Sequence, residues 1–188
     1  EVIRGPQGSL FGRNTTAGIV KFNSNRPEQE TSGYVSGSLG TYTTGNVEAA
    51  VGGSLAPDVL SGRMSVLYRT RDNWIDNGFT NEKDAMGDYS EMAGRVQLMW
   101  TPSENFTALF LTQARSLDGT SSIFRANVFD TGSNKLNQNY DRDTVYYDGG
   151  DNNPQSYDAT GYTLNLEWGL DAMTLTSISS YQLGDGYS

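Results

Sequence analysis

The side chains that most often do chemistry are scarce in this chain. Its 188 residues include no histidine and no cysteine. The commonest general base, the commonest metal ligand and the thiolate nucleophile are therefore all missing. A Ser-His-Asp triad and a thiolate metal site cannot form within the chain. We expect no catalytic residue, no bound metal and no cofactor from these residues.

Closely spaced glycines form the next candidate site, because glycine-rich loops can cradle phosphate. A phosphate-binding loop needs G-x-x-x-x-G-K-[ST], and a dinucleotide fingerprint needs G-x-G-x-x-G before a helix. Neither spacing occurs here, and Arg13 stands where a lysine would be needed. Glycine accepts positive φ and Pro6 fixes its own φ, so the segment is predicted to be a tight loop. The loop glycines are Gly5, Gly8 and Gly12.

A long polar stretch, Asp118–Ser156, contains clustered oxygen ligands and aromatic rings. Hard oxygen ligands at close spacing can bind Ca²⁺, but Asp148-Gly-Gly-Asp-Asn-Asn153 misses the EF-hand pattern. A solvated acidic loop is the preferred interpretation, because acidic polar runs usually are solvated. Aromatic faces also suit ring-bearing small ligands. The aromatic residues of this stretch are Phe124, Phe129, Tyr140, Tyr146 and Tyr147.

Charge and hydropathy limit the possible partners. The formal net charge of −9 and a pI near 4.4 argue against nucleic acid, whose phosphates select basic surfaces. No apolar run approaches the roughly 18 residues that a transmembrane helix needs. The mean hydropathy of −0.54 does not exclude a membrane barrel, in which only every second residue faces lipid.

Hydrophobic alternation predicts the strands that would position these groups. Period-2 alternation over about ten residues predicts β-strands, and such lengths suit tilted membrane-spanning strands of about 9–11 residues better than globular strands of about 5–6. The predicted strands are Gly33–Gly40, Asn46–Leu55, Leu60–Arg71, Tyr89–Trp100, Phe106–Ser116, Tyr162–Trp168 and Met173–Leu183.

From the second connection onward, the connections between these strands alternate in length. Short turns are expected at Gly40–Gly45, Ala56–Val59, Thr101–Asn105 and Gly169–Ala172, and long loops at Asp72–Asp88 and Asp118–Ser156. Outer-membrane barrels combine short periplasmic turns with long extracellular loops. An all-β fold with antiparallel up-and-down strands is predicted, and a soluble β-sandwich is the alternative that also alternates.

The N-terminal string Glu1-Val-Ile-Arg-Gly-Pro-Gln-Gly-Ser-Leu-Phe-Gly-Arg-Asn-Thr-Thr-Ala-Gly18 resembles the signature near the end of the plug domain of TonB-dependent outer-membrane receptors. The strand after Ala17-Gly18 is one residue shorter than usual, which leaves its register open. The resemblance implies that residues 1–27 are the C-terminal piece of a plug domain. Residues 28–188 would be the first, about seven, strands of an outer-membrane barrel of about 22 strands. We expect the chain to be an internal piece of a longer protein.

The resemblance also implies a function and partners. It implies an outer-membrane receptor that imports a scarce nutrient such as a ferric siderophore, and not an enzyme. The TonB complex would supply energy through an N-terminal box that this sequence lacks, and a small-molecule ligand would bind at the extracellular loops. The alternative is a non-transporting β-structure protein, either an adhesin-like surface barrel or the soluble sandwich. A hydrolytic outer-membrane enzyme is disfavoured by the missing histidine.

The resemblance finally assigns roles to particular residues. Plug arginines of the family pair with carboxylates on the barrel wall, which makes Glu48 and Glu91 candidate partners of Arg4 and Arg13. Inward strand positions could line a solute path or only form the polar lumen of any such barrel. Tryptophans near strand ends suit interfacial girdles: Trp74, Trp100 and Trp168. The plug motif comprises Arg4, Gly5, Pro6, Gly8, Gly12, Arg13 and Asn14, and the possible lumen-facing residues are Glu48, Arg63, Arg69, Glu91 and Arg95.

Overall fold

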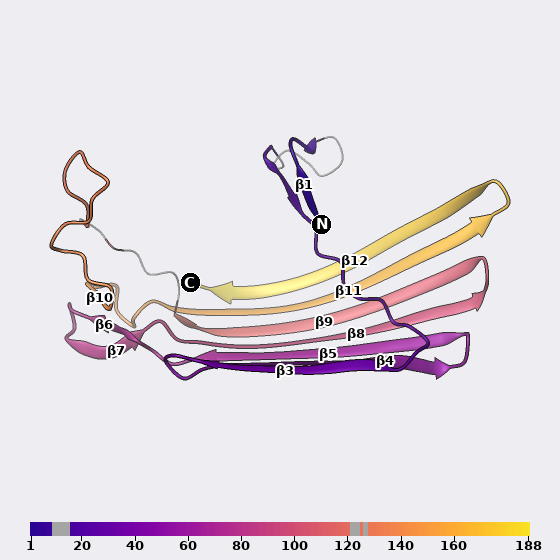
Figure 1. The fold of residues 1–188 in the computed structure, drawn as a ribbon, viewed down its shortest axis with the longest axis horizontal. Helices are drawn as coiled ribbons and strands as arrows, with labels where there is room; N and C mark the ends of the chain where they lie inside the picture. Colours follow the sequence, from indigo (N-terminus) through magenta and orange to yellow (C-terminus); the bar gives the residue numbers. More distant parts are fainter. Residues whose placement is uncertain (9–15, 121–124, 126–127) are drawn as a thin grey trace.

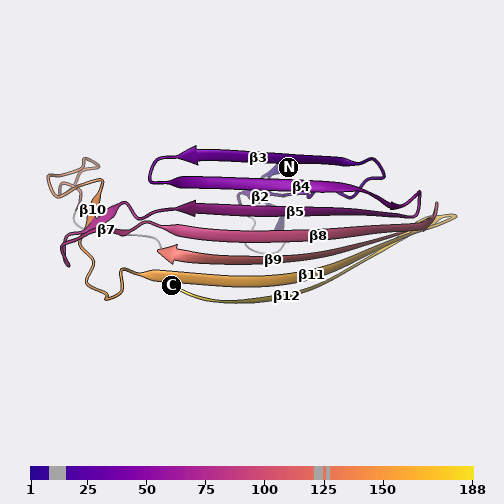
Figure 2. The ribbon, with the colours of Figure 1, turned by 90° about the horizontal axis from the view of Figure 1, so that it is seen from below.

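The computed structural model describes residues 1–8, 16–120, 125 and 128–188, and its main element is one curved, seven-stranded antiparallel sheet (Figures 1 and 2). Each long strand pairs with the next long strand along the chain. This arrangement confirms the predicted all-β up-and-down fold and excludes a sandwich of two packed sheets. The strands are β3 (Ser32–Gly40), β4 (Thr44–Ala56), β5 (Leu60–Arg71), β8 (Tyr89–Ser103), β9 (Phe106–Thr120), β11 (Pro154–Leu170) and β12 (Met173–Tyr187).

Several strands are longer than alternation predicted. Strand β11 begins at Pro154 rather than Tyr162, and its first residues pair with the end of β9 from Asp118 to Thr120. Ladder hydrogen bonds there do not depend on alternating side chains, so hydropathy missed them. Strand β8 likewise passes through Pro102 to Ser103, which leaves only a two-residue turn before β9. The register shifts between Trp100 and Ser103, and such an irregularity tolerates a proline.

From the β4–β5 turn onward, short turns and long loops lie at opposite ends of the sheet. The loops that follow β5 and β9 lie at the same end as the β3–β4 turn, and Asp72 N donates to Tyr42 O across them at 2.9 Å. The short turns β4–β5, β8–β9 and β11–β12 lie at the opposite end (Figure 1). The predicted alternation of short turns and long loops is therefore present.

The long loops contain a small sheet that sequence reasoning did not predict. Strands β6 (Ile75–Asn77) and β7 (Glu82–Met86) come from the first loop, and β10 (Thr144–Val145) comes from the second. Strand β10 pairs in parallel with β6. Ile75, Met86 and Val145 form a buried cluster beneath the three strands. The two loops are thus folded together as one loop subdomain.

The N-terminal residues form a separate hairpin. Strands β1 (Val2–Arg4) and β2 (Gly18–Val20) pair with the register Val2↔Val20, Ile3↔Ile19 and Arg4↔Gly18. This pairing gives the register of the strand after Ala17-Gly18, which the sequence left open. Gly18 has φ +140°, and a Cβ there would lie 2.5 Å from Ile3 O, so only glycine fits this close approach.

Both edges of the large sheet are unpaired. Strands β3 and β12 form the edges, and all of their residues are exposed. Within the part of the chain that the structure describes, no helix is long and apolar enough to cross a membrane.

Candidate functional site

The sheet has one apolar and one polar face. Cross-strand partners lie on the same face, and successive residues alternate between faces. The row Val51↔Met64↔Val96 continues through Thr112 to Tyr162 and Tyr181. Many apolar side chains of this face are exposed, and such a large apolar surface usually marks a site of contact with another molecule or a membrane. The exposed apolar residues of this face are Val35, Val47, Val51, Met64, Val66, Met92, Val96, Leu164, Leu175, Tyr181 and Leu183. A continuous apolar face on a single-layer sheet suits contact with lipid.

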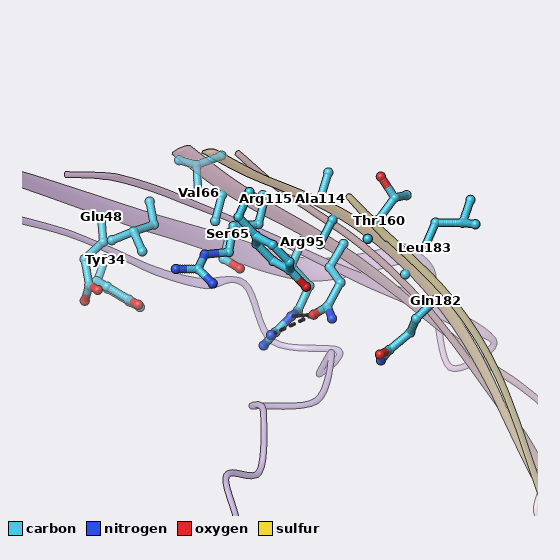
Figure 3. Close-up of a pocket in the computed structure, with 18 residues that line it drawn as sticks. Tyr34, Glu48, Ser65, Val66, Arg95, Ala114, Arg115, Thr160, Gln182 and Leu183 are labelled. Carbon is cyan, nitrogen blue, oxygen red and sulfur yellow. Dashed lines mark hydrogen bonds between the residues drawn. The ribbon is translucent and has the colours of Figure 1, made fainter. Parts of the chain in front are cut away.

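The opposite, concave face carries the polar residues. Its central row runs Ser65↔Arg95↔Gln113↔Gly161↔Gln182. In Figure 3, Tyr34, Arg95 and Gln182 point to the concave side, whereas Val66, Ala114 and Leu183 point to the other side. A hollow of about 510 Å³ lies along this row.

All five predicted lumen-facing residues fall on this concave face by register. Glu91, whose side chain is 14% exposed, accepts a hydrogen bond from Arg115 Nε at 2.7 Å. The guanidinium of Arg115 also lies 5.7 Å from the centre of the Tyr157 ring. Arg95 donates to Gln113 Oε1 from Nη2 at 3.0 Å. Among the described residues, Glu48, Arg63 and Arg69 make no side-chain hydrogen bond or ion pair.

A segment that joins the hairpin to β3 lies on the same face. We call residues Ser24–Gln29 the linker. Arg95 Nη1 lies 2.5 Å from Ser24 Oγ, and Gln97 Nε2 donates to Asn25 O at 2.9 Å. Arg26 Nη2 pairs with Glu167 Oε1 at 3.3 Å. The linker therefore contacts polar residues of β8 and β11, and its trace crosses the sheet in Figure 1.

The far end of the linker is fixed at the β4 end of the sheet. Gln29 O accepts from Ser54 N, and Gln29 Oε1 accepts from Asp58 N, both at 3.2 Å. Pro27 is fully buried. Just beyond the linker, Thr31 packs so closely on Gly53 that a Cβ there would lie 2.9 Å from Thr31 Oγ1. The absence of a side chain at Gly53 permits this approach.

The predicted plug-motif residues are placed only in part. Gly5 adopts φ +88°, in the region that favours glycine, whereas a Cβ at Gly8 would meet open space. Arg4 is exposed, and within the described residues it makes no ion pair with Glu48 or Glu91. Glu91 is bound by Arg115 instead. Three motif residues lie outside the described residues: Gly12, Arg13 and Asn14.

Asn77 is the central residue of the loop subdomain, and no sequence pattern identified it. Its side chain is fully buried. Nδ2 donates to Tyr147 O at 2.9 Å and to Asn152 Oδ1 at 3.0 Å. Oδ1 accepts from Phe79 N at 3.0 Å and from Tyr147 N at 3.2 Å. One amide therefore bonds to both long loops and uses all of its hydrogen-bonding capacity.

A surface ion pair lies beside this amide. Asp76 accepts hydrogen bonds from the Lys83 ammonium and from Asp84 N. The Lys83 side chain, followed by the Asp84 amide, lowers the pKa of Asp76 below its usual value, and Asp76 in turn raises the pKa of Lys83. Both shifts favour the charged pair.

The loop aromatics are split between exposed and half-buried positions. Phe129, Tyr140 and Tyr146 are exposed, Tyr147 is half-buried, and Phe124 lies outside the described residues. A Cβ at Gly78 would lie 2.6 Å from the Tyr146 ring, so this ring packs closely on the first long loop. Among the described residues, no group of three or more carboxylates is arranged to hold a metal ion.

The three tryptophans occupy different environments. Trp100 and Trp168 lie near one end of the sheet on its apolar face, by the pairings with Leu60 and Phe106, which fits an interfacial girdle. Trp74 lies in the loop after β5, where it stacks on Tyr42 at 5.0 Å and packs against the Ile75–Met86 cluster. Its environment is thus the loop subdomain.

Comparisons with known proteins agree with this geometry. No protein-family model matches the chain. Pesticin receptors of Yersinia pestis and Yersinia enterocolitica are 26% identical over 104 residues, which is 55% of this chain and 15% of each receptor. The crystal structure of the ferric yersiniabactin uptake receptor FyuA from Yersinia pestis matches 98% of this chain with a TM-score of 0.81 and 19% identity, over 28% of that chain.

The N-terminal hairpin, the single-layer sheet and these matches show that the chain resembles a piece of a TonB-dependent outer-membrane receptor. The particular proteins that it resembles are the pesticin receptors and FyuA, of which it spans 15% and 28% of the length. Receptors of this class are transporters rather than enzymes.

Proposed function

We propose that this chain belongs to an importer that uses TonB energy to take up a ferric siderophore or a similar scarce small molecule. Residues 1–27 are then the end of the plug and residues 28–188 the first barrel strands. The observation that carries the proposal is the two-faced sheet, whose apolar side suits lipid while its polar side holds the linker from the plug-type hairpin. The names of the relatives, which are receptors for pesticin and for ferric yersiniabactin uptake, point to ligands that reach the cell from outside.

The loop subdomain supplies the outer surface of this importer. It lies beyond the end of the sheet where the long loops gather (Figure 1), and it exposes aromatic rings that suit ring-bearing ligands. Binding there needs no energy, whereas passage through a plugged lumen does. Binding and uptake should therefore respond differently to the loss of TonB.

The test is uptake by whole cells that express the full-length receptor. The probes are a panel of radio-iron-labelled siderophores that includes ferric yersiniabactin. Accumulation of one probe should require both the receptor and TonB, while binding at the cell surface should require the receptor alone. Equal accumulation without TonB would refute the proposal. Surface binding without accumulation of any probe would favour a non-transporting adhesin-like barrel.

A further inference from the structure

The linker and the hairpin before it are held in contrasting ways. Among the described residues, the polar contacts of the hairpin stay inside it: Gly5 N donates to Ala17 O, and Glu1 and Lys21 exchange backbone hydrogen bonds. Phe22, which joins the hairpin to the linker, is 90% exposed. From Ser24 onward, successive residues are bound to the sheet. The boundary between loosely held and firmly held chain therefore falls at Asn23.

The linker is held by buried and preoriented groups, which makes its contacts with the sheet difficult to break. Gln97 is 4% exposed and donates to a backbone carbonyl, so its bond does not depend on the side chain at position 25. Buried Pro27 adds an apolar contact that water would have to replace. Arg95 is itself oriented by Gln113, which accepts from two of its nitrogens at 3.0 and 3.3 Å. A preoriented guanidinium loses less conformational entropy when it binds.

We propose that Arg95 and Gln97 are positioning residues that keep the linker fixed to the barrel wall during import, so that movement of the plug begins upstream of Ser24. The inference rests on the proposed function. In this proposal the linker belongs to the part of the receptor that stays in place, and Phe22-Asn23 is the hinge. The plug can then shift without losing its place, because its last anchored residues never leave β8.

The first experiment fixes the linker covalently in the full-length receptor. Asn25→Cys and Arg63→Cys are joined by a short bifunctional maleimide. Arg63 is the cross-strand neighbour of Gln97, which contacts Asn25, and the Arg63 side chain takes no part in the anchor. The same cells are compared before and after treatment, so folding is not in question. TonB-dependent uptake of the labelled ferric siderophore should be unchanged by the cross-link. Abolished uptake with normal surface binding would overturn the inference, because it would show that the linker must move.

The second experiment weakens the anchor. Arg95→Ala combined with Glu167→Ala, in the same cysteine background, removes two of the linker contacts. The yield of the cross-link should fall by roughly tenfold, and uptake should fall while surface binding is kept, because a few hydrogen bonds to charged groups suffice for such a shift. Arg69→Ala is the matched control: it removes an arginine from the same face that does not touch the linker. Equal yields in both variants would refute the role of Arg95.

Failure of the inference and failure of the proposed function give different results. If the untreated receptor accumulates no probe, the proposed function fails and the inference fails with it. If the untreated receptor imports through TonB but the cross-linked one does not, the inference alone fails.

Discussion

The replacement Asn77→Leu should unfold the loop subdomain and spare the sheet. The leucine side chain has the same number of heavy atoms and the same branching as asparagine but cannot form hydrogen bonds, so the change removes four bonds from a fully buried site. At about 0.5–1.5 kcal/mol for each bond, the local loss is about 2–6 kcal/mol. Three backbone groups, Phe79 N, Tyr147 N and Tyr147 O, lose a partner together.

Amide hydrogen exchange of the full-length receptor in detergent measures this loss. A loss of about 2 kcal/mol lowers protection roughly thirtyfold, since each 1.4 kcal/mol is a factor of ten. The effect should be largest at the amides of Phe79 and Tyr147, while amides of β8 and β9 stay unchanged, because small loop units open independently of a core sheet. Asn134→Leu, at an exposed position of the second long loop, is the matched control. Unchanged protection at Tyr147 would refute the central role of Asn77.

Three further predictions concern topology, pH and the plug. Protease added to whole cells should cut within residues 72–88 and 121–153 and spare the turns at 57–59 and 104–105, because exposed polar loops are the preferred sites of nicking; the opposite pattern would invert the orientation. Ionised Asp76 should stabilise the loop subdomain above its unfolded pKa near 3.8 and cease to do so as the pH falls through the lower folded value. The protection factors of amides in these loops should therefore fall more steeply from pH 6 to pH 3 in wild type than in Asp76→Asn. Parallel curves of protection factor against pH would contradict this. Arg4→Ala in the full-length receptor should raise passive leak of a small antibiotic or lower energised uptake with ligand binding unchanged, and normal values of both would make Arg4 an ordinary loop residue.

The long strands were predictable because hydrophobic alternation marks the residues that share one face of a strand. Val47, Val51 and Val66 therefore marked their strands clearly. The extensions of β9 and β11 were not predictable in this way, because residues such as Gly119 and Ser156 pair through the backbone and carry no alternating apolar side chains. Pro102 was misleading for a related reason: proline suggests a turn, but the irregular register before Ser103 admits it into the strand.

For the candidate site, the sequence predicted only which face of the sheet each residue occupies, because side chains alternate between the two faces of a strand. The shared face of Glu48, Arg63 and Arg95 follows from even spacing within strands. The partner that each side chain selects does not, since Glu91 binds Arg115 from a neighbouring strand. The bonds of Arg95 and Gln97 to the linker and three of the four bonds of Asn77 join residues about 70 positions apart, and no local pattern encodes such pairs. The loop subdomain was missed for the same reason.

The parallel pairing of β10 with β6 has a consequence for receptor engineering. Loops of barrel proteins are usually treated as exchangeable parts, each transplanted alone onto a new scaffold. Here, a graft of the second loop alone would arrive without the strand that it pairs with and without the amide that binds Tyr147 and Asn152. The smallest transplantable unit is therefore the pair of loops, and sequence changes in one loop are constrained by the surface of the other.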